Sequence, residues 1–282
     1  MRTKKKANTL SINELVAYCI VGIGAVLMIF PFYFMFVFAT HTDRAILSIP
    51  PPLLPGTAFF ENVNTLMTRL PFFWKNMAWS TYIASLTTVL NLFFCTLAGF
   101  GFAMYEFRFK EKLFAMVMGT MLMPAFITMI PTVLVMSWLG WMNQPRALFI
   151  PAACGALGVF MMRQYISSAI PKELIDAARI DGCSEFGIFF RIIVPLVTPA
   201  LGTLALITFI ASWNSFLGPL IVMNDMERYT VPLALRAMQG TGQIPWGAVC
   251  AGSAIAVLPL MVMFAFASRR LIDGLTAGAV KS

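Results

Sequence analysis

Long apolar segments alternate with short polar segments along the whole chain. A helix rises about 1.5 Å per residue, so a hydrocarbon core of about 30 Å takes roughly 20 apolar residues to cross. The first run is longer than the apolar core of a signal peptide, and we expect it to be a retained span. We expect six spans, at about 15–39, 76–105, 113–139, 147–162, 200–223 and 247–268.

Prolines and glycines mark the irregular parts of this pattern. Pro124 and Pro131 interrupt the third span. Such a helix is favoured as an inner, cavity-facing one, because neighbouring groups or water must satisfy the backbone groups that the prolines free. The segment 40–75 carries several prolines and a glycine, and we expect it to form an extended loop.

One charged stretch, from Pro171 to Pro195, lies between the fourth and fifth spans and is predicted to form a helical hairpin. Pro171 suits a first helical position, and Gly182 should end the first helix. Ser184 and Glu185 should start a second helix, which carries phenylalanines at helical spacing until Pro195 stops it. A merely solvated loop seldom exposes such a row of aromatic side chains, so we expect a partner to dock here.

The composition places the chain in one class. With 59% hydrophobic residues, 11% charged residues and a mean hydropathy of +0.81, the 282-residue chain is predicted to be an all-α, polytopic membrane protein. The net charge of +8 does not indicate nucleic-acid binding, because the basic residues are scattered at the ends of apolar runs. Five cysteines without CxxC spacing, and a single histidine, support neither a disulfide framework nor a metal site.

The distribution of lysine and arginine predicts the orientation. Fourteen of the 20 lie in the N-terminal tail, in the loops after the second and fourth spans, and in the C-terminal tail, whereas six lie in the other loops. An excess of positive charge marks the cytosolic side of a membrane protein. We therefore expect both termini and the hairpin in the cytosol.

Two absences from the sequence bear on the source of energy. The chain has no GxxxxGK[ST] phosphate-binding loop, and all 12 Asp and Glu residues lie outside the expected spans. Ion-coupled transporters commonly place an ionisable residue in the membrane, at a cost of about 2.5–3.5 kcal/mol. If the chain transports a solute, we expect its energy to arrive through another subunit at the hairpin.

The hairpin sequence, DAARIDG followed by FFRIIVP, resembles the EAA loop of ATP-binding-cassette (ABC) importer permeases. Asp176 stands where that loop usually has Glu, and Val194 where it usually has Leu. SWNSFLGPL in the fifth span and the ending GLTAGAVK add a narrower likeness. Together these motifs are similar to carbohydrate permeases of the maltose-transporter type, in particular the smaller partner of a heterodimeric pair, and within that group to arabino-oligosaccharide and lactose permeases.

This resemblance implies the type I ABC importer permease fold. It divides the chain into a cytosolic N-tail (1–14), a six-helix permease domain (15–268) that includes the coupling loop (163–198), and a cytosolic C-tail (269–282). The chain would be multi-pass in the cytoplasmic (inner) membrane of a bacterium or archaeon, and would form half of a sugar translocation path.

The resemblance also implies the partners. They are a second homologous permease subunit, two cytosolic ABC ATPase subunits, an extracytoplasmic sugar-binding protein and the lipid bilayer. No cofactor is expected on this chain, because ATP and Mg would bind to the ATPase.

The same resemblance assigns site residues, none of them catalytic. The residues implied in coupling to the ATPase are Glu173, Asp176, Ala177, Ala178, Asp181, Gly182, Phe189, Ile192 and Pro195. Gly274 and Gly278 in the tail are candidates for a further ATPase contact, with a frayed terminus as the alternative.

Trp213 and Asn214, near the centre of the fifth span, leave two interpretations open. An aromatic face beside an amide could line the path of a sugar ring. Alternatively, Asn214 bonds to a neighbouring helix and Trp213 fills space, and this second interpretation is favoured because polar residues in spans often act in that way.

Other functions stay open at this stage. An ABC importer for a non-sugar solute would be favoured by clustered carboxylates or arginines in the spans, and the sequence shows none there. A stand-alone channel or secondary transporter would work without partner subunits. A scaffold or receptor is the weakest alternative, because no soluble sensory domain is apparent.

Overall fold

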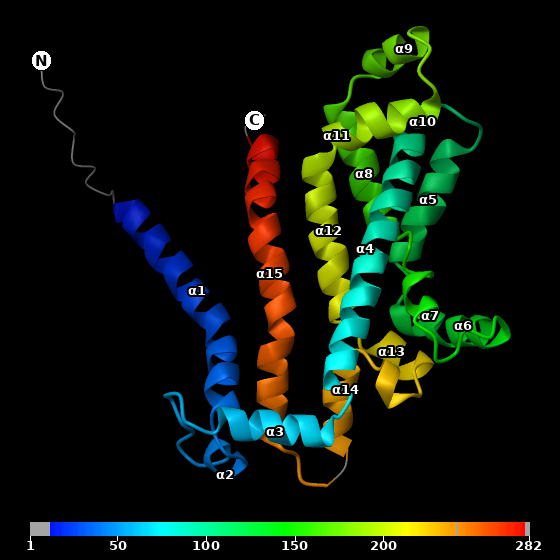
Figure 1. Cartoon of the computed structure of the whole chain (residues 1–282). Helices are drawn as coiled ribbons and strands as arrows, with labels where there is room; N and C mark the ends of the chain where they lie inside the picture. The colour runs from blue at the N-terminus through cyan, green and yellow to red at the C-terminus, as the bar shows by residue number, and fades with distance from the viewer. Residues whose placement is uncertain (1–11, 241, 280–282) are drawn as a thin grey trace, which may run out of the picture. The chain divides into compact units, whose positions relative to one another are not determined.

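The computed structural model describes residues 12–240 and 242–279, and within these ranges every regular element is helical (Figure 1). The predicted all-α fold class is confirmed. The α-helices are α1 (Ile12–Ala39), α2 (Asp43–Ile46), α3 (Phe59–Arg69), α4 (Phe73–Met104), α5 (Lys110–Met121), α6 (Ala125–Trp138), α7 (Arg146–Phe149), α8 (Ala156–Ala169), α9 (Lys172–Ile180), α10 (Glu185–Ile188), α11 (Val194–Leu196), α12 (Thr198–Trp213), α13 (Leu217–Val222), α14 (Val231–Ala237) and α15 (Trp246–Ala279). A π-helix, η1 (Phe189–Ile193), and two 3-10 turns, η2 (Met226–Arg228) and η3 (Met238–Gly240), complete the set.

Three described helices are long and apolar enough to cross a membrane without a break. They are Glu14–Ala39 of α1, the whole of α4, and Trp246–Ala265 of α15. Two further pairs qualify only as bent spans: α5 with α6, bent by 101°, and the segment Glu185–Leu196 with α12, bent by 80°. The described chain thus has three to five candidate spans, and the first, second and sixth expected spans match the three unbroken helices.

The other expected spans are interrupted. The third is divided between α5 and α6, and Pro124 stands immediately before α6, where its ring and missing N–H suit a helix start. The fourth does not form one helix, because the chain between α7 and α8 is irregular from Ile150 to Gly155. The fifth ends as a regular helix at Trp213 and resumes in α13.

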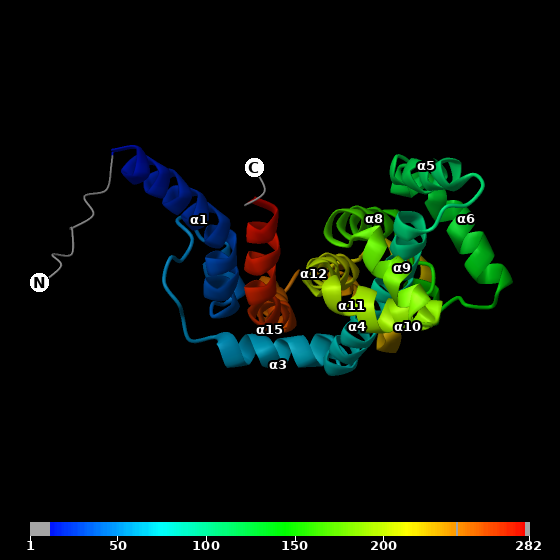
Figure 2. The same ribbon diagram turned by 90° about the horizontal axis from the view of Figure 1, so that it is seen from above.

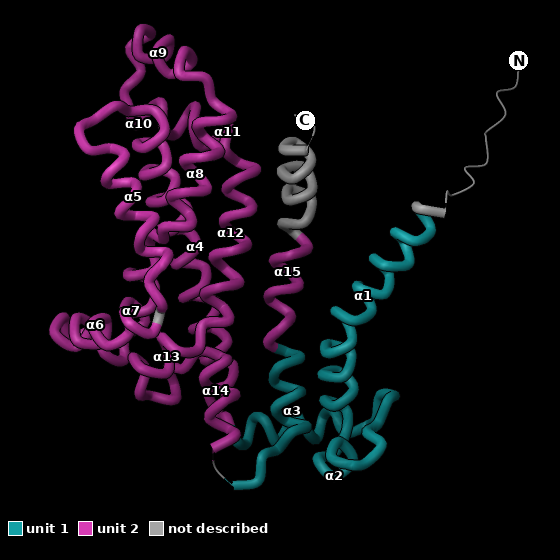
Figure 3. The backbone as a smooth tube through the Cα atoms, turned by 180° about the vertical axis from the view of Figure 1, so that it is seen from behind, with its two compact units in different colours: residues 1–69, 241–255 teal, residues 70–240, 256–282 magenta. Residues whose placement is uncertain are grey.

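The chain divides into two compact units, residues 1–69 with 241–255 and residues 70–240 with 256–282 (Figure 3). In the first unit, the segment expected to be an extended loop contains α2 and α3 instead. α3 forms because it buries Asn62 and Leu66, one helical turn apart, on a single face. Asn62 Nδ2 donates hydrogen bonds to the carbonyls of Ala39 and His41, at 2.9 Å and 2.8 Å, which holds α3 against the end of α1.

In the second unit, α4 packs along α8 and α12, as Figures 1 and 2 show. The approach to α8 is close enough to need glycine. A Cβ on Gly99 would lie 2.6 Å from Met162 Cβ and 2.8 Å from the Arg163 nitrogen, and one on Gly158 would lie 2.6 Å from Cys95 Sγ. These two glycines therefore set the distance between α4 and α8.

The buried face of α4 is polar at several positions, and these side chains bind the backbone of irregular segments. Asn91 Nδ2 donates to the carbonyl of Ala152, in the irregular stretch between α7 and α8, at 3.1 Å. Asn76 Nδ2 donates to the carbonyls of Met226 and Tyr229. Ser80 Oγ accepts from the Val231 N–H at 2.8 Å. The polar residues of α4 thus satisfy backbone groups that a broken helix leaves free in an apolar medium.

We predict that Gly99→Ala destabilises the protein by about 1–3 kcal/mol, because the added methyl group meets the α8 backbone, which cannot move aside as a flexible side chain could. Gly101→Ala is the matched control on the same helix: a Cβ there has nothing within 4 Å, and alanine should be neutral or stabilising by up to about 1 kcal/mol. Thermal unfolding of the detergent-purified variants tests the pair, and equal melting temperatures would contradict the packing described.

Candidate coupling hairpin and membrane cavity

The stretch between the fourth and fifth expected spans forms the predicted pair of helices. α9 starts directly after Pro171, which has a φ of −63°, and the backbone reverses at Gly182, which has a φ of +77°. A positive φ at this turn requires glycine or a residue that tolerates the left-handed region. Ser184 caps α10, with its Oγ accepting from the Gly187 N–H at 3.2 Å. We call residues 171–195 the coupling hairpin.

The end of the second helix differs from the prediction. Pro195 does not stop it, because α10 continues through the π-turn η1 into α11, which contains Pro195. The direction changes two residues later, at Val197, before α12 begins with Thr198 and Pro199.

The two helices bury one face and expose the other. Ile175 and Ala178 of α9 and Ile188 of α10 lie in one buried cluster with residues of α4, α8 and α12. Phe189 was expected among the exposed aromatics but is only 1% exposed, packed edge-on against Phe93 of α4. The burial of these residues makes the coupling hairpin an integral part of the second unit.

The residues implied in ATPase coupling divide by exposure. Glu173, Asp176, Ala177, Asp181, Gly182 and Pro195 are exposed, Ile192 is half-buried, and Ala178 and Phe189 are buried. Ile180, Phe186 and Phe190 add apolar surface, and Ile180 is 87% exposed. The exposed part is thus a small surface of mixed acidic and apolar character around the turn at Gly182.

Arg179 ties this turn to the end of α4. Its Nε donates to Glu185 Oε1 at 2.8 Å and its Nη1 donates to Asp176 Oδ1 at 3.1 Å. The guanidinium group also lies over the Tyr105 ring, 5.2 Å from its centroid, and the Tyr105 hydroxyl donates to Glu185. The shorter acid at position 176, where Glu is usual, therefore bonds within its own helix.

Protonation states follow from these bonds. The hydrogen bond from Arg179 lowers the pKa of the Glu185 carboxyl, and the bond from Tyr105 adds to the effect. Burial, and then the bond to Glu185, raise the pKa of the Tyr105 hydroxyl. A carboxyl whose pKa is lowered by folding stabilises the fold at neutral pH and loses that contribution as the pH falls through the lowered pKa. The network is thus intact at neutral pH.

A second ion-pair group joins α9 to the loop after α4. Glu106 Oε1 accepts from Lys172 Nζ at 3.1 Å and from Lys110 Nζ at 3.2 Å, and the bond from Lys172 is the main cause that lowers the pKa of Glu106. Glu111 of α5 pairs with Arg163 in the middle of α8, at 2.9 Å. Exposed ion pairs contribute little to the free energy of unfolding. The pair of Lys172 with Glu106 therefore orients α9 without adding much stability.

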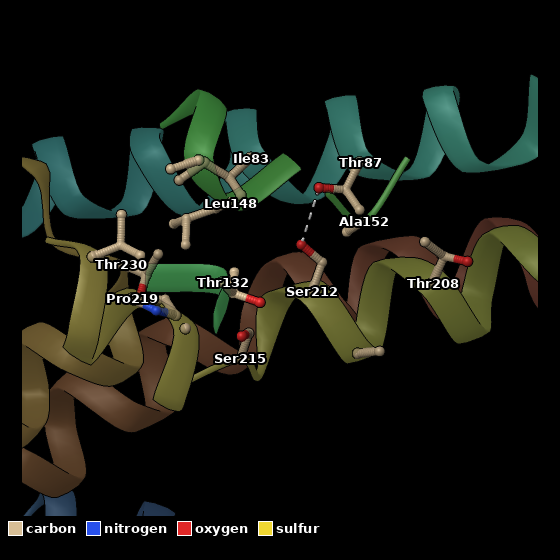
Figure 4. A pocket seen from close by; sticks show the side chains of 14 residues that line it. Ile83, Thr87, Thr132, Leu148, Ala152, Thr208, Ser212, Ser215, Pro219 and Thr230 are labelled. Carbon is tan, nitrogen blue, oxygen red and sulfur yellow. Dashed lines mark hydrogen bonds between the residues drawn. The ribbon is translucent and has the colours of Figure 1, made fainter. Parts of the chain in front are cut away.

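A cavity of about 310 Å³ lies in the second unit, away from the hairpin (Figure 4). The elements α4, α6, α7, α12 and α13 border it. Its lining comprises Ile83, Thr87, Thr132, Ala147, Leu148, Ala152, Thr208, Ala211, Ser212, Ser215, Gly218, Pro219, Val222 and Thr230. Hydroxyl groups supply its polar side chains, and none of the described lining residues carries a charge.

Trp213 and Asn214, the residues considered for a sugar path, do not line this cavity. Trp213 is 3% exposed and stacks on Phe209, with ring centroids 5.8 Å apart, in an apolar cluster with Ala84. Asn214 is exposed at the end of α12, and its side chain forms no hydrogen bond to the described residues. The space-filling interpretation fits Trp213, whereas Asn214 forms no interhelical hydrogen bond with the part of the chain that the structure describes, and the sugar-path interpretation of both residues stays a prediction.

The hydroxyl residues beside these two positions were not predicted from the sequence. Thr208, Ser212 and Ser215 recur at intervals of four and three residues, which places them on one face of α12 up to its end. Polar residues at helical spacing within an apolar run were the signal that could have identified the cavity.

The ends of the chain carry the remaining candidates. Gly274 and Gly278 lie within the bounds of α15, and their contact with an ATPase stays a prediction. Residues 1–11 of the expected N-tail and residues 280–282 fall outside the described residues. Among the described residues, no group of three or more His, Cys, Asp or Glu could hold a metal ion.

The sequence and the fold were compared with those of known proteins. The family described as binding-protein-dependent transport system inner membrane component matches residues 10–275. The chain is 35% identical to the arabinooligosaccharides transport system permease protein AraQ of Halalkalibacterium halodurans, over 80% of this chain and 81% of that protein. It is 32% identical to the lactose transport system permease protein LacG of Rhizobium radiobacter, over 95% and 96%.

Two further similarities bear on substrate and fold. The chain is 33% identical to the sn-glycerol-3-phosphate transport system permease protein UgpE of Salmonella typhi, over 90% of this chain and 92% of that protein. Its fold matches a chain of a bacterial ABC transporter involved in alginate import, with a TM-score of 0.80, 20% identity, and coverage of 95% and 99%. The expected type I importer permease fold is therefore confirmed.

We predict that Arg179→Gln loosens the turn of the coupling hairpin, because Glu185, Asp176 and Tyr105 all lose their common partner. Hydrogen–deuterium exchange of residues 177–188 should then be at least several-fold faster at neutral pH. Arg191→Gln is the control, since Arg191 is exposed and pairs with no carboxylate of the described chain. Equal exchange in both variants would show that Arg179 does not order the turn.

Proposed function

The chain belongs to the family of binding-protein-dependent transport system inner membrane components, and we propose that it couples ATP hydrolysis on a separate subunit to solute import through its coupling hairpin. As a member of this family it is a transport permease, integral to the membrane, rather than an enzyme. The main observation in support is the two-sided packing of the hairpin. Its inner face is buried against helices of the second unit, whereas its outer face is exposed and could bind a partner.

The need for a partner ATPase is supported by what the spans lack. No phosphate-binding loop occurs in the sequence, and no acidic residue lies in the expected spans, where ion coupling would use one. We propose that two cytosolic ABC ATPase subunits bind ATP and Mg. One of them would bind the exposed residues around Gly182 in a surface cleft. A second homologous permease subunit would complete the path, and an extracytoplasmic binding protein would deliver the solute.

The proposed orientation follows the distribution of positive charge. Lysine and arginine are concentrated in the segments that include the hairpin and both tails, so these would be cytosolic in the cytoplasmic (inner) membrane of a bacterium or archaeon. This orientation puts the hairpin on the side where ATP is available. The expected division into a cytosolic N-tail, a permease domain and a C-tail accords with it and stays a prediction.

The proposed solute is a sugar, in particular an oligosaccharide, since the relatives AraQ and LacG are named for arabinooligosaccharide and lactose transport. The alternative is a phosphorylated or otherwise non-sugar solute. It is supported by the relative UgpE, which is named for sn-glycerol-3-phosphate transport. Within residues 12–240 and 242–279, no structural feature favours a stand-alone channel or an ion-driven transporter.

We predict that Gly182→Pro abolishes association with the ATPase and lowers ATP-driven uptake at least tenfold. Proline cannot adopt the φ of +77°, and it removes the N–H that donates to the Arg179 carbonyl at 3.0 Å. Co-purification of the ATPase with the membrane-inserted variant, followed by uptake into proteoliposomes, measures both effects.

Gly182→Asn is the matched control, because asparagine tolerates the left-handed region and keeps the N–H. It should retain ATPase binding and most of the uptake. Normal ATPase association in Gly182→Pro would refute the proposed role of the hairpin.

A further inference from the structure

Hydroxyl groups from several elements converge on the cavity of the second unit. Figure 4 shows Ser212 of α12 and Thr87 of α4 facing one another, and their hydroxyl oxygens lie 3.5 Å apart. Thr208 lies one turn before Ser212 and donates to Asn91 Oδ1 at 3.3 Å. Thr132 of α6 completes the group around Ser212 and Ser215.

Thr230 also lines the cavity, but its Oγ1 is buried, forms no hydrogen bond with any described residue, and has almost no accessible surface. This hydroxyl is therefore enclosed by the protein and does not face an occupant of the cavity.

The chemistry of the lining defines that occupant. Hydroxyls both donate and accept, as do the hydroxyls of a sugar, and the apolar side chains between them can pack against the carbon faces of a ring. The volume of about 310 Å³ is at the lower end of the range for small-molecule sites. Such a cavity holds one or two rings of an oligosaccharide at a time.

An anionic solute does not fit the same lining. A phosphate or carboxylate in a buried site needs a cation or an array of N–H donors, and the lining holds no lysine, arginine or histidine. Arg146 of α7 stands directly before the lining residue Ala147, but it does not line the cavity, and its guanidinium group lies over the Trp141 ring. The cavity thus differs in chemistry from what a phosphate ester requires.

We propose that this subunit contacts the solute itself, in the cavity formed by Thr87, Thr132, Thr208, Ser212 and Ser215, and that the cavity accepts uncharged polyhydroxylated solutes and rejects their phosphate esters. The proposal rests on the importer function given above and assigns the residues and the charge selectivity of the path. Trp213 and Asn214 have no part in it, because neither lines the cavity.

The first test uses the assembled complex in proteoliposomes, with a panel of radiolabelled neutral di- and trisaccharides to find a transported probe. The double variant Thr208→Val and Ser212→Ala should still assemble and should raise the KM for that probe at least tenfold. Thr203→Val is the control, since Thr203 is on the same helix, bonds only to the Pro199 carbonyl within its helix, and lies outside the cavity. An unchanged KM in the double variant would overturn the proposal.

A second variant separates a binding role from a structural one. Ser215→Ala removes a half-buried hydroxyl that lines the cavity, so the melting temperature of the complex should stay the same while the KM for the sugar increases. A KM that stays unchanged at equal stability would contradict a role of Ser215 in binding.

The charge selectivity is tested by competition. The phosphate ester of the transported sugar should compete at least tenfold more weakly than the neutral sugar, and equal competition would overturn the selectivity. Complete absence of ATP-driven uptake of any neutral saccharide by the wild-type complex would refute the sugar-importer function, and this inference with it. Normal wild-type uptake with unaffected cavity variants would refute the cavity alone.

Discussion

The second unit of this protein depends on how its broken helices satisfy their backbone groups. In a bilayer, an irregular segment is tolerated only where protein or water pairs its N–H and C=O groups. The buried polar side chains of α4 meet this need: Asn91 binds the stretch between α7 and α8, and Asn76 and Ser80 bind the segments before α14. The cavity lies among these irregular segments, so the same side chains that stabilise the fold also keep open the space in which a solute can bind.

The same helix connects the cavity with the coupling hairpin. Thr87 of α4 lines the cavity, and Tyr105 at its C-terminal end bonds to Glu185 of the hairpin. Between them, Phe93 packs on Phe189, and Gly99 brings α4 into contact with α8. A force applied to the hairpin therefore reaches the cavity through a closely packed body rather than through a flexible loop. This is the arrangement that an importer driven by a cytosolic ATPase requires.

Local chemistry made part of the fold predictable from the sequence. Pro171, Gly182 and Ser184 act within three residues of their own positions. Gly182 and Ser184 lie at the predicted turn and helix start, and Pro171 lies one residue before the first helical position predicted for it. Other features depend on residues far away in the sequence. The burial of Phe189 needs α4 and α8, and α3 forms because Asn62 can reach the end of α1. The cavity combines residues of α4, α6 and α12, so only the spacing of Thr208, Ser212 and Ser215 along one helix could be read in advance.

The coupling hairpin and the cavity-lining helix α4 belong to one rigid body. Spin-label distance measurements test this rigidity directly. The labels are attached to Ile180→Cys, on the exposed face of α9, and to Thr81→Cys, on the exposed side of α4, in a variant whose native cysteines are replaced. In the assembled complex, a rigid body gives one narrow distribution of the distance between the two labels, the same with and without bound ATP. A distribution that broadens or shifts when ATP binds would show that the hairpin moves separately from α4, and would contradict a single rigid body.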